Sequence, residues 1–140
     1  MEFHKILVPI DFSKPSRAAL ALAGGLARAS GGRLTCLHVN ELPPAFPEAE
    51  DSAEIAARLR EDLTGRMKWA VDNVVGDDVE VECLLVDGGA EREILRQAVA
   101  GGHDLLVIGC KGRTDWERSL IGSVAERVLG GCAVPVLVTH

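Results

Sequence analysis

Apolar residues alternate along the chain between short dense runs and longer stretches in which they recur every three or four positions. Dense runs are typical of strands, and the wider spacing is typical of helices with one buried face. The pattern predicts five strands, at residues 4–10, 33–39, 79–86, 104–109 and 135–139. Residues 6–8 and 105–108 are apolar throughout, which indicates strands covered on both faces.

The third run differs from the others because it alternates at its start. Val79, Val81 and Cys83 are separated by Glu80 and Glu82. This alternation favours a strand with one wetter face, and we therefore expect an edge strand.

Four helices are predicted between the strands. The first has Pro15 in its opening turn and Gly31 and Gly32 at its end. Gly24 and Gly25 in its interior cost about 1 kcal/mol each relative to alanine, so we expect close packing of this helix on the sheet there. A segment with Pro43, Pro44 and Pro47 then predicts a loop that could lie over a site.

The remaining helices are read from apolar spacing and from glycines. The second carries one buried stripe, formed by Ile55, Leu59, Leu63, Met67, Val71 and Val74. The third spans Ala90 to Ala100 and points Ile94, Leu95, Ala98 and Val99 inward. The fourth begins near Gly122 or Ser123 and ends before Gly130 and Gly131.

This β-α alternation predicts an α/β fold. We expect a single domain over residues 1–140, with an open five-stranded parallel sheet and helices on both faces. Ligands of such sheets bind at the carboxyl ends of the strands, where the strand order reverses. With the order 3-2-1-4-5 the crevice lies between residues 9–11 and the segment from Gly109 onward. With the order 2-1-3-4-5 it lies beside Asp11 and Asp87, and the pattern itself leaves both orders open.

Composition excludes several classes of function. A net charge of -6 opposes a long nucleic-acid track, and an aromatic content of 4% opposes stacking platforms for bases. The apolar run at the N-terminus is too short for a signal peptide or a membrane span, so we expect a cytoplasmic protein without membrane contact. The histidines are scattered, and the cysteines form no C-x-x-C pair, so no metal site is predicted. We read Cys36, Cys83 and Cys132 as buried or nearly so, and only Cys110 as exposed.

The segment GCKGRTDWERSLIGS, residues 109–123, holds the candidate chemistry. Glycine at 109 and 112 would let the backbone take a positive φ and turn its N–H groups toward an anion. Gly122 and Ser123 stand where the last helix begins, and a helix start offers unpaired N–H donors to a phosphate. A plain connector between strand and helix explains these residues equally well, because glycine-rich loops of this kind are common. The standard nucleotide fingerprints are also missing.

At these positions the sequence resembles the nucleotide-binding branch of the universal stress protein family. Gly109, Gly112, Gly122 and Ser123 reproduce its G-x2-G-x9-G-[ST] motif with both spacings intact. The stretches ILVPIDFS, GGAEREIL and VPVLVT resemble other parts of the family, so the likeness covers essentially the whole chain.

The resemblance implies a Rossmann-like 3-2-1-4-5 sheet that binds ATP, alone or with Mg2+, between the first and fourth strands. Pro9 and Asp11 would lie near adenine and ribose, the Val39 backbone would meet the adenine edge, and Ile108 would pack near the base. The phosphates would be surrounded by Gly109, Gly112, Gly122, Ser123 and Val124. The resemblance also implies a homodimer through residues 135–139, whose unpaired edge is a template for pairing.

Two departures from the family stand beside the motif. Cys110 occupies a position that is often a small hydroxyl residue, and Lys111 one that is often histidine. An exposed Cys110 beside a cation would be open to oxidation. A proline that the family has near Ala90 is also missing, which leaves the start of that helix less fixed.

The resulting hypothesis is that the chain is an ATP-binding regulatory protein of the stress response. In this hypothesis nucleotide binding changes which protein the homodimer binds, and that partner is unknown. Three alternatives stand beside it: a slow ATPase, a dimeric interaction module without physiological nucleotide, and a phosphoacceptor receiver domain that uses Asp11 and Asp87. For the ATPase we expect slow turnover at most, because Asp11 and Asp87 are the carboxylates placed near the crevice and neither is a clear base for water. No catalytic residue is therefore assigned.

Overall fold

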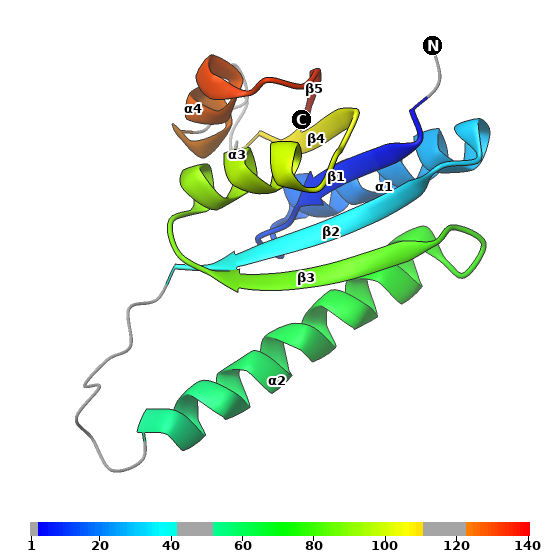
Figure 1. The fold of residues 1–140 in the computed structure, drawn as a ribbon. Helices are drawn as coiled ribbons and strands as arrows, with labels where there is room; N and C mark the ends of the chain where they lie inside the picture. The colour runs from blue at the N-terminus through cyan, green and yellow to red at the C-terminus, as the bar shows by residue number, and fades with distance from the viewer. Residues whose placement is uncertain (1–2, 42–51, 111–122) are drawn as a thin grey trace.

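The computed structural model describes residues 3–41, 52–110 and 123–140. All five expected strands form one parallel sheet. They are β1 (Lys5–Pro9), β2 (Arg33–Asn40), β3 (Val81–Asp87), β4 (Leu105–Gly109) and β5 (Val136–Thr139). Their order is β3-β2-β1-β4-β5, so the order 3-2-1-4-5 is confirmed and the alternative 2-1-3-4-5 is wrong (Figure 1).

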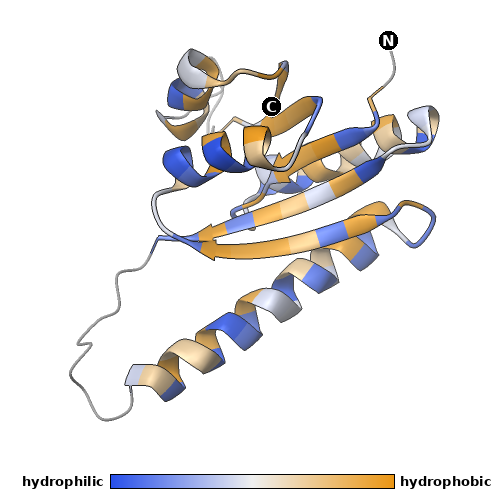
Figure 2. Cartoon of the chain, viewed as in Figure 1, coloured by the Kyte–Doolittle hydropathy of each residue, from blue (hydrophilic) through white to orange (hydrophobic). Residues whose placement is uncertain are grey.

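Helices cover both faces of this sheet. On one face lie α1 (Lys14–Ser30), α2 (Ser52–Ala70) and a π-helical turn, η1 (Val71–Val75), which pack on Ile6, Val8 and Cys36. On the other face α3 (Ala90–Ala100) and α4 (Ser123–Gly131) pack on Leu7, Leu37 and Leu106. Successive side chains of a strand point to opposite faces, so β1 supplies both clusters. The strands are coloured mainly hydrophobic in Figure 2.

The ends of α1 follow its sequence signals. The side chain of Ser13 caps the N-terminus by accepting a hydrogen bond from the Ser16 N–H, and Pro15 lies in the first turn. Gly31 ends the helix at φ 66°, a left-handed conformation that glycine adopts without steric cost.

The interior glycines of α1 have different surroundings from those expected. A Cβ on Gly24 would lie 3.2 Å from the Val75 side chain, so the close packing is against η1 rather than against the sheet. Nothing lies within 4 Å of such an atom on Gly25, and the expectation of close packing is wrong there.

Two other apolar residues expected in the core are exposed. Ile55 is 62% exposed because the first turns of α2 lie away from the sheet, whereas Leu63 and Met67 further along are buried (Figure 1). Val99 is also 62% exposed, on the outer side of α3, while Ile94 and Ala98 face the core. Among the described helices, none is both long and apolar enough to cross a membrane.

Candidate functional site

A crevice lies where the strand order reverses, at the carboxyl ends of β1 and β4. Among the described residues it encloses a cavity of about 90 Å³, smaller than the roughly 300–1,000 Å³ of most small-molecule sites. Most of its walls are apolar, and the polar side chains come from the turn after β1, the first turn of α1, and the end of β2 with the residue after it. The described lining residues are Pro9, Ile10, Asp11, Ser13, Ser16, Leu37, His38, Val39, Glu41, Ala90, Ile94, Ile108, Gly109, Val124 and Ala125.

The turn from β1 into α1 is held by its own side chains. The Asp11 carboxylate accepts hydrogen bonds from the backbone N–H of Ser13 at 3.0 Å and from the Ser13 hydroxyl. The Ser16 hydroxyl accepts from the Asp11 N–H at 3.3 Å and donates to the Ser13 carbonyl at 3.0 Å. These bonds fix the position of an exposed carboxylate at the mouth of the crevice.

Phe12, between Asp11 and Ser13, has φ 65°, an uncommon conformation for a bulky residue that costs about 1–3 kcal/mol. Its ring lies 4.6 Å from the His38 ring and 4.1 Å from the Arg66 guanidinium. His38 in turn donates from Nδ1 to the Ile10 carbonyl at 2.7 Å, since a carbonyl oxygen can only accept. Packing from β2 and α2 therefore holds this strained turn in place.

Gly109 is required by packing against α1. A Cβ at this position would lie 2.5 Å from the Pro15 carbonyl oxygen and 2.9 Å from the Ser16 nitrogen. Its φ is not positive, so our expectation that Gly109 uses a left-handed backbone to approach an anion is wrong. The missing side chain instead lets the end of β4 approach the first turn of α1.

The predicted site residues divide into three groups. Those that the structure brings together in the crevice are Pro9, Asp11, Val39, Ile108, Gly109 and Val124. Ser123 is exposed at the first position of α4 and is not among the described lining residues, although its neighbour Val124 is. Gly112 and Gly122 lie outside the described residues, as do Lys111, Arg113 and Arg118.

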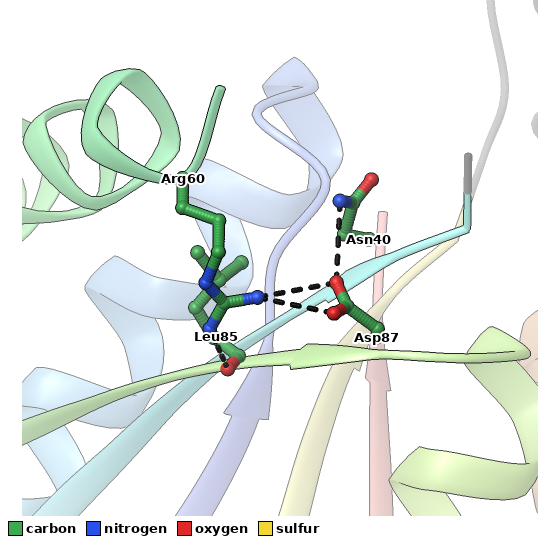
Figure 3. Close-up of polar contacts among 4 residues, drawn as sticks. All are labelled: Asn40, Arg60, Leu85 and Asp87. Carbon is green, nitrogen blue, oxygen red and sulfur yellow. Dashed lines mark hydrogen bonds and ion pairs between the residues drawn. The ribbon is translucent and has the colours of Figure 1, made fainter. Parts of the chain in front are cut away.

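Asp87 ends the outer strand β3 and is not among the described lining residues of the crevice. Figure 3 shows its polar contacts with Asn40 and Arg60. Both its carboxylate oxygens are 3.2 Å from Arg60, and Asn40 donates to it at 3.3 Å. Arg60 also donates to the Leu85 carbonyl, which ties α2 to the end of β3. Our placement of Asp87 beside the crevice is wrong, and the acidic pocket of a receiver domain is not formed.

Sequence reasoning missed several residues that line the crevice. Glu41 takes the place expected for Asp87 as a second lining carboxylate, and His38 and Ile94 also reach the walls. The sequence could have indicated His38 as a lining residue, because it is next to Val39 at the carboxyl end of a predicted strand. Among the described lining residues Asp11 and Glu41 carry charge, and none is lysine or arginine.

Two cysteines differ from expectation. Cys110 is 2% exposed, so the oxidation imagined for an exposed thiol at this position is ruled out by burial. Cys83, expected inside, is exposed because β3 is at the edge of the sheet.

The fold and the crevice define an open α/β protein with a small-molecule site at the reversal of strand order. A profile of the Universal stress protein family matches residues 2–140, and the chain belongs to this family. Universal stress protein MJ0531 of Methanocaldococcus jannaschii is 32% identical over 139 residues, which cover 97% of this chain and 81% of that protein.

Solved structures agree with the fold. The structure of hypothetical protein MJ0577, determined to assign its biochemical function, superposes with a TM-score of 0.83 at 27% identity, covering 99% of this chain and 96% of that one. A universal stress protein in complex with cAMP superposes with a TM-score of 0.66 at 28% identity, covering 100% of this chain and 98% of that one.

Proposed function

We propose that this chain binds an adenine nucleotide in the crevice between β1 and β4, and that occupancy regulates its association with other proteins. The observation that carries the proposal is an apolar crevice with a fixed carboxylate, Asp11, at the point where open α/β sheets bind ligands. A family relative has been solved with cAMP, which supports an adenine ligand.

The described walls suit the nucleoside part of such a ligand. Ile108 and Val39 offer apolar surface to a base, and the Val39 backbone is near enough to the crevice to meet its edge. Asp11 would accept hydrogen bonds from ribose hydroxyls, because an ionised carboxylate is an acceptor only. Pro9, beneath the turn, would close the floor below the sugar.

The phosphates would lie toward the start of α4. A helix N-terminus offers N–H donors and a positive dipole end, and this favours anions near Ser123 and Val124. In this proposal Gly109, Gly112 and Gly122 complete the phosphate loop, and Lys111, Arg113 or Arg118 adds charge. Three or four charge-assisted hydrogen bonds at about 1.5–3 kcal/mol each would, after the costs of binding, support affinity in the micromolar range.

ATP is the nucleotide that we favour, alone or with Mg2+. Phosphate oxygens of the nucleotide, together with several retained waters, would coordinate the metal, as is usual for Mg2+. The same proposal treats residues 1–140 as one nucleotide-binding domain and assigns it no catalytic residue.

Titration calorimetry on protein stripped of nucleotide tests the proposal, with ATP, ADP, AMP and cAMP compared in the presence and absence of Mg2+. We expect micromolar binding of at least one of them. Asp11→Asn should weaken binding about tenfold, because it removes charge from the acceptor while keeping an oxygen for Ser13. Asp87→Asn is the matched control and should bind as the wild type does. Absence of binding at millimolar nucleotide would end the proposal.

We also propose a homodimer through β5. In the described sheet β5 pairs only with β4, and its Leu137 is 37% exposed. An apolar edge strand of this kind is a template for pairing with a second copy. Sedimentation velocity should give a dimer for the wild type and a monomer for Leu137→Lys. An identical sedimentation coefficient for both proteins would contradict this interface.

A further inference from the structure

Two cysteines face each other across neighbouring strands. Cys36 of β2 is the direct register partner of Cys83 of β3 in a parallel pair. Adjacent strands lie about 4.7–4.9 Å apart, and the Cα atoms of disulfide-bonded cysteines usually lie about 4.4–6.8 Å apart. The backbone spacing therefore suits a disulfide between these positions.

Both side chains point to the same face of the sheet. Cys36 belongs to the core cluster under α1 and α2. Val81 and Leu85, two positions before and after Cys83, pack against the same cluster. Because side chains of a strand alternate, Cys83 points to that face as well.

The two thiols differ in their access to solvent. Cys36 is 0% exposed, whereas Cys83 is exposed because β3 has a strand on only one side. A dissolved oxidant can reach Cys83 directly, and Cys36 can react only through Cys83. In this arrangement Cys83 reacts first and Cys36 second.

The contact between the thiols activates the outer one. The Cys36 thiol donates a hydrogen bond to the Cys83 sulfur, which lowers the pKa of Cys83 to about 7 against the effect of its partial burial. Of the charges around it, Asp72 of η1 and Glu82 of β3 act to raise this pKa, and Lys68 of α2 acts to lower it. The same contact, together with burial, raises the pKa of Cys36, which stays protonated. The lowered pKa increases the share of Cys83 that is thiolate, the reactive form, at neutral pH.

We propose that Cys83 and Cys36 form a two-thiol oxidation site, in which a peroxide oxidises Cys83 and Cys36 then closes a disulfide between β2 and β3. In the first step the Cys83 thiolate attacks one oxygen of hydrogen peroxide, the O–O bond breaks, and the leaving hydroxide takes up a proton to form water. Cys83 is then a sulfenic acid.

The second step consumes the inner thiol. The Cys36 sulfur loses its proton and attacks the Cys83 sulfur, the S–O bond breaks, and hydroxide leaves with that proton as water. Two thiols are oxidised to one disulfide while one peroxide is reduced to two waters. A small thiol reductant reverses the change by exchange at the exposed Cys83 sulfur. The site does not use the crevice, so it stands apart from nucleotide binding.

The experiment treats reduced full-length protein with hydrogen peroxide, blocks the remaining thiols with N-ethylmaleimide and maps the peptides by mass spectrometry. We expect one disulfide, joining the Cys36 and Cys83 peptides, and its full reversal by dithiothreitol. The rate of Cys83 alkylation by iodoacetamide should rise about tenfold from pH 6 to pH 8, following the thiolate fraction. A linkage between other cysteines, or no linkage while Cys83 is overoxidised, would overturn the proposal.

Two variants and a control separate the roles. Cys83→Ser should abolish oxidation of Cys36, because the buried thiol then meets no oxidant. Cys36→Ser should leave a sulfenic acid on Cys83 that dimedone traps. Cys132→Ser, at a half-buried thiol outside the pair, should form the disulfide at the wild-type rate. The proposal fails if Cys36 is oxidised as fast in Cys83→Ser as in the wild type.

Discussion

The central and the outer strands of the sheet differ in where along their length a functional side chain can reach a ligand or solvent. In β1 and β4 four of the five residues are buried, whereas no residue of β3 or β5 is. Strands covered on both faces and flanked on both sides have no room for reactive groups along their length, so the candidate nucleotide site is confined to their carboxyl ends. At the β3 edge a side chain in the middle of a strand, Cys83, reaches solvent. Position within the sheet thus decides where function can arise.

Truncation of one leucine in a central strand and one in an outer strand should have the largest difference in effect. Leu106→Ala in β4 should lower the free energy of unfolding by about 2–5 kcal/mol, because Leu106 is fully buried and leaves a cavity. At a protein concentration low enough to dissociate the proposed dimer, Leu137→Ala in β5 should lower the free energy of unfolding by less than about 1 kcal/mol, because this side chain is partly exposed. Urea denaturation measures both, and equal losses would contradict the contrast.

A second test concerns the end of β4. Gly109→Ala should lower the free energy of unfolding by about 1–3 kcal/mol, since the added Cβ would meet the backbone of α1. Gly25→Ala is the control, and should raise the free energy of unfolding by about 0.5–1 kcal/mol because α1 gains helix propensity without a clash. Thermal and urea unfolding would show the opposite signs, and a neutral Gly109→Ala would refute the packing role.

A smaller effect is expected from the ion pair at the β3 edge. Arg60→Ala should cost about 0.2–1 kcal/mol, because the Arg60–Asp87 pair is largely exposed to solvent. It should leave nucleotide affinity unchanged. Arg58→Ala, which breaks an exposed pair with Glu54 on the same helix, is the matched control for stability. A loss of affinity in Arg60→Ala would bring Asp87 back into the candidate site.

The smallest effect concerns the pH dependence of stability at Asp78. Its hydrogen bond and ion pair with Arg28 hold the pKa of this carboxyl below its usual value. A carboxyl with a lowered pKa contributes stability that is present above its unfolded pKa of about 3.9 and is lost as pH falls through the folded value. Asp78→Asn should therefore lower stability slightly at neutral pH and lose this difference under acid. Unfolding midpoints measured between pH 2 and 7 would show whether the two curves converge.

Much of the fold could be predicted because strands and helices leave local signals. The dense runs at residues 6–8 and 105–108 mark strands buried on both faces, and Ser13, Pro15 and Gly31 mark the ends of α1. Burial within helices was harder to predict: Ile55 fits the spacing of its helix, yet that turn has no sheet beside it. Six of the predicted site residues line the crevice, because the carboxyl ends of neighbouring parallel strands meet at one edge.

The kind and order of the helices and strands, and the family motif around Gly109, could be read from the amino-acid sequence, since both depend on neighbouring residues and fixed spacings. The hydrophobic pattern left the strand order open, and the family resemblance implied the order that the structure confirms. The lining of the crevice by Glu41 in place of Asp87, and the exposure of Cys83 in place of Cys110, became known from the tertiary structure alone. Each of these depends on contacts between segments far apart in the chain. The alternation at residues 79–83 did predict that β3 lies at the edge of the sheet, but it did not predict which side chains of that strand reach solvent, because this depends on the segments packed beside them.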